Sequence, residues 1–123
     1  AVIDCDGVPG ALEFLRLYSS RAPFFLISGT PEEELRDIML KRALGRYFVS
    51  IHGSPRKKVP IINELIGLHQ LDKKRCLFVG DAMIDYLAAK ATGIKFIGRV
   101  KQGNVSPFPN GTEIVSDLSQ LNL

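Results

Sequence analysis

The chain of 123 residues is long enough to form one domain with its own core, and its composition, 46% hydrophobic and 24% charged, is typical of a soluble globular protein. No apolar run approaches the roughly 20 residues that a membrane-spanning helix needs, so we expect no membrane partner. The formal charge of +3 is small, and the two basic tracts, 56–58 and 73–75, are too short to indicate a nucleic-acid-binding surface.

Short apolar runs alternate with helical patterns along the chain. The predicted strands are 1–5, 24–28, 47–51, 75–80 and 94–98, with a further short strand at 113–115. The predicted helices are 9–20, 30–44, 58–68 and 82–93, with a short helix at 116–121. Strands that are apolar on both faces and separated by helices predict a parallel sheet covered on both sides, which is an α/β fold.

Two helices carry recognisable end signals. Thr30 and Pro31 precede three glutamates, so we expect Thr30 to cap the second helix and Pro31 to lie in its first turn. Gly45 is expected to end that helix, and Gly93 to end the helix 82–93.

The two cysteines, Cys5 and Cys76, each lie in an apolar strand-like run without histidines at metal-ligand spacing. We expect both to be buried reduced thiols, which favours a cytoplasmic location, and a disulfide between adjacent strands is the alternative. His52 and His69 are expected to be structural or surface residues.

Polar residues that could carry chemistry follow the predicted strands or open the next helix. They are Asp4, Asp6, Ser28, Gly29, Lys58, Asp81 and Asp85. Open sheets of this class bind ligands at the carboxyl ends of their strands. Carboxylates gathered there repel each other by on the order of 1 kcal/mol per pair, and a hard divalent cation removes the repulsion. Mg²⁺ prefers one or two carboxylates together with a substrate phosphate, so the pattern predicts a Mg²⁺ and phosphate site.

Four motifs at these positions resemble those of the haloacid dehalogenase superfamily of phosphohydrolases, in its phosphoglycolate phosphatase and β-phosphoglucomutase-like branch. In chain order they are DCDGV, LISGT, the lysine of GSPRKK, and GDAMID, and together they span Val2 to about Val100. The resemblance implies a three-layer αβα Rossmann-like fold. Its mainly parallel sheet would have five or six strands in the order 3-2-1-4-5.

The resemblance also implies roles for the motif residues. Asp4 would be the nucleophile, forming an aspartyl-phosphate, and would ligate Mg²⁺. Asp6 would act as general acid and then general base, and its backbone carbonyl would contact the metal. Lys58 would neutralise charge between Asp4 and the phosphate, with Lys57 as a rival for that role.

The second and fourth motifs would hold the phosphate and the metal. Ser28 and the Gly29 amide would bind phosphate oxygens. Asp81 would ligate Mg²⁺, and Asp85 would support the metal directly or through water.

The implied function is a Mg²⁺-dependent phosphatase that hydrolyses a small phosphorylated metabolite. The alternatives are a phosphomutase of the same superfamily, a non-catalytic module that binds phospho-ligands, and a receiver-like signalling module. A receiver domain would have its phosphorylated aspartate at the end of the third strand, but this sequence has His52, Gly53 and Ser54 there. The founding dehalogenases lack the second aspartate of the first motif, so Asp6 favours phosphate chemistry.

The segment after the first motif departs from the family pattern. Val8 is followed at once by Pro9, and PGALEFL resembles the segment that re-enters the core after a cap domain. We therefore expect the 1–123 catalytic core to be discontinuous in a longer protein, with the cap omitted between Val8 and Pro9. The competing interpretation is a capless enzyme that acts on large substrates, and the oligomeric state is open.

Overall fold

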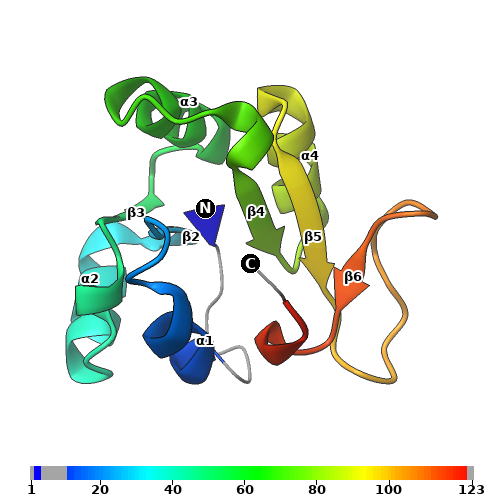
Figure 1. Cartoon of the computed structure of the whole chain (residues 1–123), viewed down its shortest axis with the longest axis horizontal. Helices are drawn as coiled ribbons and strands as arrows, with labels where there is room; N and C mark the ends of the chain where they lie inside the picture. The colour runs from blue at the N-terminus through cyan, green and yellow to red at the C-terminus, as the bar shows by residue number, and fades with distance from the viewer. Residues whose placement is uncertain (1, 4–10, 122–123) are drawn as a thin grey trace.

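The computed structural model describes residues 2–3 and 11–121, with side chains from residue 13 onward except that of residue 119. Its sheet has six strands in the order β3-β2-β1-β4-β5-β6, and every neighbouring pair is parallel. The strands are β1 (Val2–Ile3), β2 (Phe25–Pro31), β3 (Ser50–Ser54), β4 (Leu77–Gly80), β5 (Lys95–Arg99) and β6 (Ile114–Val115). The predicted α/β fold with parallel strands is confirmed (Figure 1).

Helices connect the strands. They are α1 (Ala11–Tyr18), α2 (Glu32–Lys41), α3 (Lys58–Leu68) and α4 (Met83–Thr92), with 3-10 turns η1 (Gly45–Tyr47), η2 (Lys73–Arg75) and η3 (Leu118–Gln120). Figure 1 places α2 beside the β3 end of the sheet and the segment that leads to β6 at the other end. In the part of the chain that the structure describes, no helix is long and apolar enough to cross a membrane.

The core lies on both faces of the sheet. Because successive strand residues point to opposite faces, Phe25 and Ile27 pack in the cluster that contains α3 and α4 residues. Phe24 packs instead with α1 and η3, and Leu26 packs with α2. This alternation gives the three layers, and it explains why the apolar run of β2 is continuous rather than alternating with polar residues.

The start of α2 differs from the prediction. The helix begins at Glu32 after an N-cap residue Pro31 with extended backbone (φ −53°, ψ 137°), and no side chain caps it. The prediction that Thr30 caps the helix is wrong, because β2 continues through Thr30 to Pro31, which pairs with Ser54 of β3.

The end of α2 also differs. The helix ends at Lys41, and Ala43 takes the left-handed conformation with φ 55°. The Ala43 N–H then bonds the Leu40 carbonyl and the Leu44 N–H bonds the Met39 carbonyl, which is a Schellman ending. The prediction that Gly45 ends the helix is therefore wrong, whereas Gly93 does end α4, with φ 77°.

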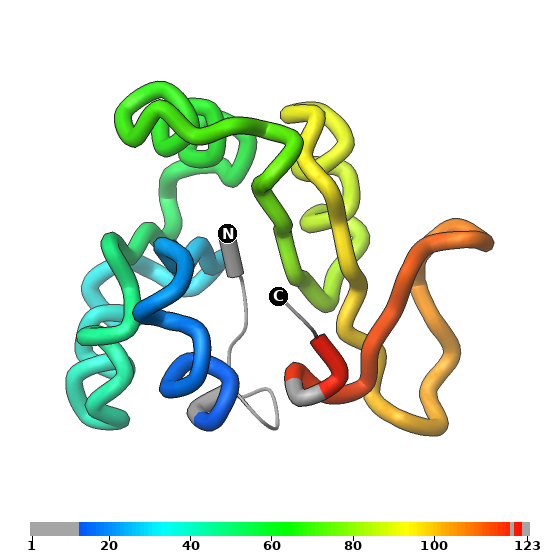
Figure 2. The backbone as a smooth tube through the Cα atoms, in the orientation of Figure 1, coloured from blue at the N-terminus to red at the C-terminus, as the bar shows by residue number. Residues whose placement is uncertain are grey.

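The third strand is displaced from its predicted position. It was expected at 47–51 and lies at Ser50–Ser54, because Gly45–Tyr47 forms a 3-10 turn first. Further along, the segment between β5 and β6 leaves the sheet and returns to it (Figure 2), and it is anchored by Phe108, which is buried. The Phe108 ring lies directly against Gly98, where an added Cβ would collide with the ring.

Cys76 is a free, buried thiol, as predicted, and burial raises its pKa. Cys5 lies outside the described residues.

Candidate active site

The candidate site lies where parallel strands end. β1 pairs with β2 and with β4, so the carboxyl ends of these three strands emerge at one edge of the sheet. Asp4 and Asp6, the predicted nucleophile and acid–base residue, lie outside the described residues, although Asp4 directly follows Ile3 of β1 in the sequence. The predicted residues on the neighbouring elements can be placed.

The carboxyl end of β2 bulges. Ile27 pairs with His52 and Pro31 pairs with Ser54, so the three residues 28–30 face the single residue Gly53. Ser28, which is buried, accepts a hydrogen bond on its Oγ from the Thr30 N–H at 3.1 Å. That bond holds the hydroxyl while leaving its proton free to be donated to another group.

Gly29 lies at the exposed part of the bulge. Among the residues that the structure describes, none has an atom within 4 Å of a Cβ added there, so they leave the space beside its backbone open. A backbone amide next to a hydroxyl in an open bulge is a suitable donor pair for an anion.

A buried ion pair lies at the same edge. The Lys58 ammonium, at the start of α3, bonds Asp85 Oδ1 in the first turn of α4, and the side chains are only 13% and 1% exposed. Lys57, the rival for the lysine role, is exposed and precedes the helix. The geometry therefore supports Lys58 as the lysine that reaches the candidate site.

Two backbone features hold Asp85. Its Oδ2 accepts a hydrogen bond from the Ala82 N–H at 3.1 Å, so the carboxylate caps the helix from within. Gly80 ends β4 directly against it, since an added Cβ at Gly80 would lie 2.5 Å from Asp85 Cβ and 2.6 Å from Oδ2. Sequence reasoning used Gly80 only as part of a motif and missed that the Asp85 position requires it.

Asp81 differs from Asp85 in its surroundings. It follows β4 and is exposed, so its carboxylate is open to solvent. Asp85 is fully buried, and both of its oxygens already accept hydrogen bonds. Within residues 2–3 and 11–121, no three His, Cys, Asp or Glu side chains are grouped as metal ligands.

His52 lies beside the bulge but is engaged elsewhere. Its Nε2 is 2.7 Å from Ser50 Oγ, and burial, followed by the Arg56 charge, lowers its pKa. This environment agrees with the prediction that His52 has a structural role.

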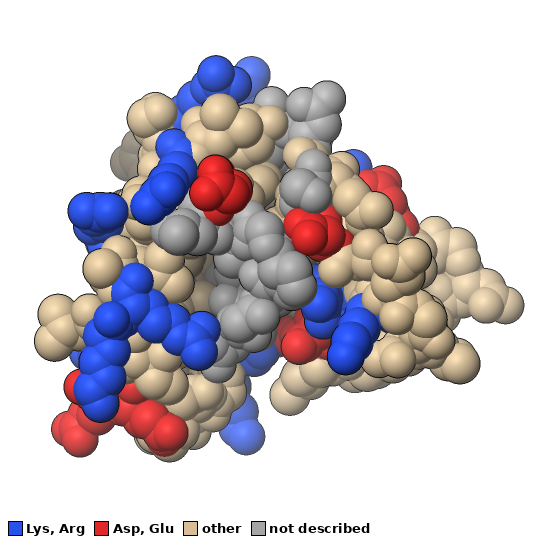
Figure 3. Space-filling view, turned by 90° about the horizontal axis from the view of Figure 1, so that it is seen from below, with Lys and Arg blue, Asp and Glu red and all other residues tan. Residues whose placement is uncertain are grey.

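The face at the carboxyl ends of the strands carries charges of both signs. Figure 3 views the molecule from below Figure 1, and on this side lysines and arginines lie among aspartates and glutamates. A mixed surface of this kind is compatible with an anionic substrate bound next to a cation.

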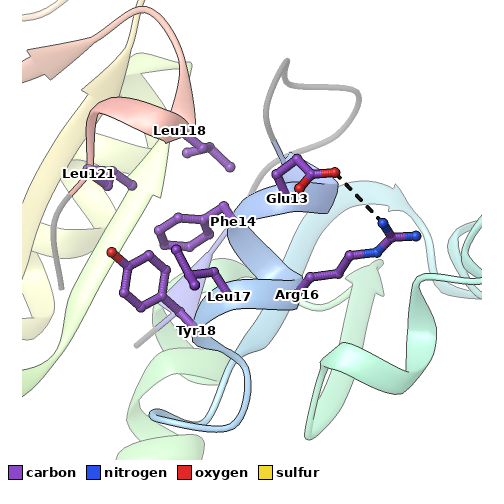
Figure 4. A pocket seen from close by; sticks show the side chains of 7 residues that line it. All are labelled: Glu13, Phe14, Arg16, Leu17, Tyr18, Leu118 and Leu121. Atoms are coloured by element: carbon purple, nitrogen blue, oxygen red, sulfur yellow. Dashed lines mark ion pairs between the residues drawn. The ribbon is translucent and has the colours of Figure 1, made fainter.

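A cavity elsewhere holds none of the predicted site residues. It lies between α1 and η3, has a volume of about 390 Å³ and is mostly apolar, with the Arg16–Glu13 pair (3.7 Å) at its rim (Figure 4). Its lining residues are Glu13, Phe14, Arg16, Leu17, Tyr18, Leu118 and Leu121. This lining offers packing surface rather than groups for phosphate chemistry.

Residues 2–99 match the family described as haloacid dehalogenase-like hydrolase, and the chain belongs to that family. The second predicted motif, LISGT, lies within β2. Lys58 of the third begins α3, and the fourth runs from the last residue of β4 into α4.

Curated relatives carry phosphatase names. The chain is 30% identical over 122 residues to the phosphoglycolate phosphatase of Pseudomonas fluorescens Pf0-1, covering 92% of this chain and 45% of that protein. It is 34% identical over 95 residues to the phosphoglycolate phosphatase of P. fluorescens Pf-5, covering 72% of this chain and 35% of that protein. The chain thus spans less than half the length of the curated relatives that it matches.

Solved structures show the same fold. The core domain of a candidate phosphoglycolate phosphatase from Streptococcus pneumoniae TIGR4 superposes with a TM-score of 0.73 at 23% identity, covering 96% of this chain and 88% of that chain. The magnesium-bound candidate HAD hydrolase YfnB from Bacillus subtilis superposes with a TM-score of 0.74 at 16% identity, covering 89% of this chain and 52% of that chain.

Proposed function

We propose that the protein is a Mg²⁺-dependent phosphatase that hydrolyses a small phosphorylated metabolite through an aspartyl-phosphate on Asp4. The observation that carries the proposal is the buried Lys58–Asp85 pair at the same edge of the sheet as the open bulge of Ser28 and Gly29. A lysine fixed by a carboxylate supplies positive charge at a constant position. Phosphoryl transfer depends on such positioning and charge neutralisation more than on any other protein contribution.

Each residue has a distinct task in this proposal. The Ser28 hydroxyl and the Gly29 amide bind phosphate oxygens, and Lys58 offsets charge between the phosphate and the Asp4 carboxylate. Asp4 attacks phosphorus and displaces the leaving oxygen, which receives a proton from Asp6. Asp6 then accepts a proton from the water that cleaves the acyl-phosphate and releases inorganic phosphate.

The donor set at this edge is suited to Mg²⁺. Mg²⁺ takes one or two carboxylates, keeps several waters and bridges to phosphate, and Asp81 offers an exposed carboxylate at the end of β4. Asp4, the Asp6 carbonyl and Asp81 would hold the ion, which supplies positive charge to the phosphate oxygens. Because Asp85 is already bonded to Lys58 and to the Ala82 N–H, we place its contribution mainly in holding the lysine.

The curated relatives favour a phosphatase over a phosphomutase, since three of them carry the name phosphoglycolate phosphatase or probable phosphoglycolate phosphatase. Phosphoglycolate is therefore the first natural substrate to assay. The short coverage of those relatives agrees with a cap inserted between Val8 and Pro9 in the complete protein, where it would select the substrate.

The test is hydrolysis of p-nitrophenyl phosphate and of phosphoglycolate by the full-length protein, with Mg²⁺ and with EDTA. We expect activity only with Mg²⁺, and we expect Asp4→Asn to abolish it. Saturating Mg²⁺ should also raise the Tm, since the ion would bind the assembled site and not the unfolded chain. Undiminished turnover in Asp4→Asn would remove the nucleophile assignment.

A further inference from the structure

The bulge at the end of β2 is set by the strand next to it. Three residues, 28–30, face one residue of β3, so the surplus chain must leave the plane of the sheet and return to it at Pro31. Residues 28–30 project farther from the sheet when the backbone that follows them lies farther from β3. The residue at the point of closest approach is Gly53.

Gly53 leaves no room for a side chain. An added Cβ would lie 2.5 Å from the Thr30 carbonyl oxygen, 2.7 Å from Glu32 Cα and 2.8 Å from Glu32 N. All three are backbone atoms of the returning segment, so that segment would have to move outward by several tenths of an ångström. The three displaced atoms belong to Thr30 and Glu32, which lie one and three residues after Gly29 in the chain.

Polar contacts tie the same segment to β3. The Gly53 N–H donates to Glu32 Oε1 at 3.4 Å, and Glu32 Oε2 lies 3.7 Å from Arg36 Nη2. Arg36 Nη2 also donates to the Ile51 carbonyl at 3.2 Å. The first residue of α2 is thereby held to β3 at two points, Gly53 and Ile51.

We infer that Gly53 and Glu32 are positioning residues for phosphate binding: together they set the depth of the bulge that presents Ser28 and Gly29. This inference rests on the proposed phosphatase function and assigns a role to residues that make no contact with the substrate themselves. A misplacement of 1 Å at a positioned group can cost about a hundredfold in rate, so we expect a shift of several tenths of an ångström at the phosphate-binding groups to cost about tenfold.

The test compares Gly53→Ala with the control Gly67→Ala, an exposed glycine of α3 where an added Cβ meets nothing within 4 Å. The measurements are the inhibition constant of inorganic phosphate, KM for p-nitrophenyl phosphate, the Mg²⁺ concentration for half activation, and the Tm. We expect Gly53→Ala to raise the phosphate inhibition constant and KM about tenfold with the Mg²⁺ constant unchanged. Gly67→Ala should leave all three constants at wild-type values.

Glu32 variants keep the test decisive if Gly53→Ala fails to fold. Glu32→Ala should weaken phosphate inhibition about threefold, and Glu32→Gln, which retains the acceptor for the Gly53 N–H, should recover most of that loss. Folded variants at both positions with wild-type phosphate inhibition would overturn the inference and leave the proposed function standing. A wild-type protein that binds no phosphate and hydrolyses neither ester would remove the proposed function and this inference together.

Discussion

Replacing Lys58 by methionine tests the ion pair at the site independently of activity. The substitution keeps an unbranched side chain, one heavy atom shorter, but removes the charge. It leaves the Asp85 carboxylate, 1% exposed, with the hydrogen bond from the Ala82 N–H. Removing one partner of a buried ion pair costs about 3–5 kcal/mol, because the other charge stays buried without compensation.

The loss should fall near the lower end of this range. Asp85 keeps one compensating contact, because its Oδ2 still accepts the hydrogen bond from the Ala82 N–H. We therefore expect the free energy of unfolding to fall by about 3–4 kcal/mol at pH 7.

The assay is urea unfolding followed by far-UV circular dichroism at pH 7, with Lys57→Met as the control at an exposed neighbour. Lys57→Met should change stability by less than about 0.5 kcal/mol. Adding Asp85→Asn to Lys58→Met should recover part of the loss, because the uncompensated charge is then gone. A loss no larger than that of Lys57→Met, or no recovery in the double variant, would refute the account of Asp85 as a buried charge that depends on Lys58.

Further outcomes follow from other features. Ala43→Gly should stabilise the protein by about 1 kcal/mol, because Ala43 has a left-handed backbone with φ 55°. The control Ala91→Gly, at an exposed position of α4, should destabilise it by about as much. Tm shifts of the same sign and size in the two variants would contradict this expectation. Gly98→Ala should lose about 1–3 kcal/mol by displacing the Phe108 ring, and an unchanged Tm would show that the ring can move freely. Because burial holds the pKa of His52 below its ordinary value of 6.5, the unfolded chain takes up that proton first, and stability should fall as pH drops below about 6.5. His52→Gln should lessen that fall in urea unfolding at pH 7.5 and 5; an identical pH dependence would count against it.

Apolar runs were sufficient to predict the main elements. The helix predicted at 58–68 has those bounds in α3, and β4 and β5 lie within one or two residues of their predicted ranges. Parallel strands buried on both faces leave this signal because each residue contributes to one of two apolar layers.

Residues that usually begin or end a helix predicted the ends of α2 less reliably, because contacts with the rest of the fold determine where this helix starts and stops. Thr30 has the chemistry of a cap, yet strand pairing of Pro31 with Ser54 kept the chain extended past it. Gly45 has the usual chemistry of a helix end, but α2 ends earlier: Ala43 has a strained left-handed backbone, and Leu44 directly after it packs against the core. The intrinsic preference of a residue for a helix end is weaker than such packing contacts.

The candidate site was predicted as a set of residues but not as an arrangement. Lys58 and Asp85 are 27 residues apart, so nothing local shows that they pair or that Gly80 makes room for them. The bulge at 28–30 depends on the register between β2 and β3, and register is a property of two segments together.

The central position of β1 couples chemistry to the integrity of the fold. Among the described strands, β1 alone bridges the pair β3-β2 and the trio β4-β5-β6. Its two partners both come later in the sequence, β2 from Phe25 and β4 from Leu77. A nascent chain therefore cannot assemble the rim of the site before β4 has been synthesised, and loss of pairing at Val2 and Ile3 would divide the sheet between β2 and β4.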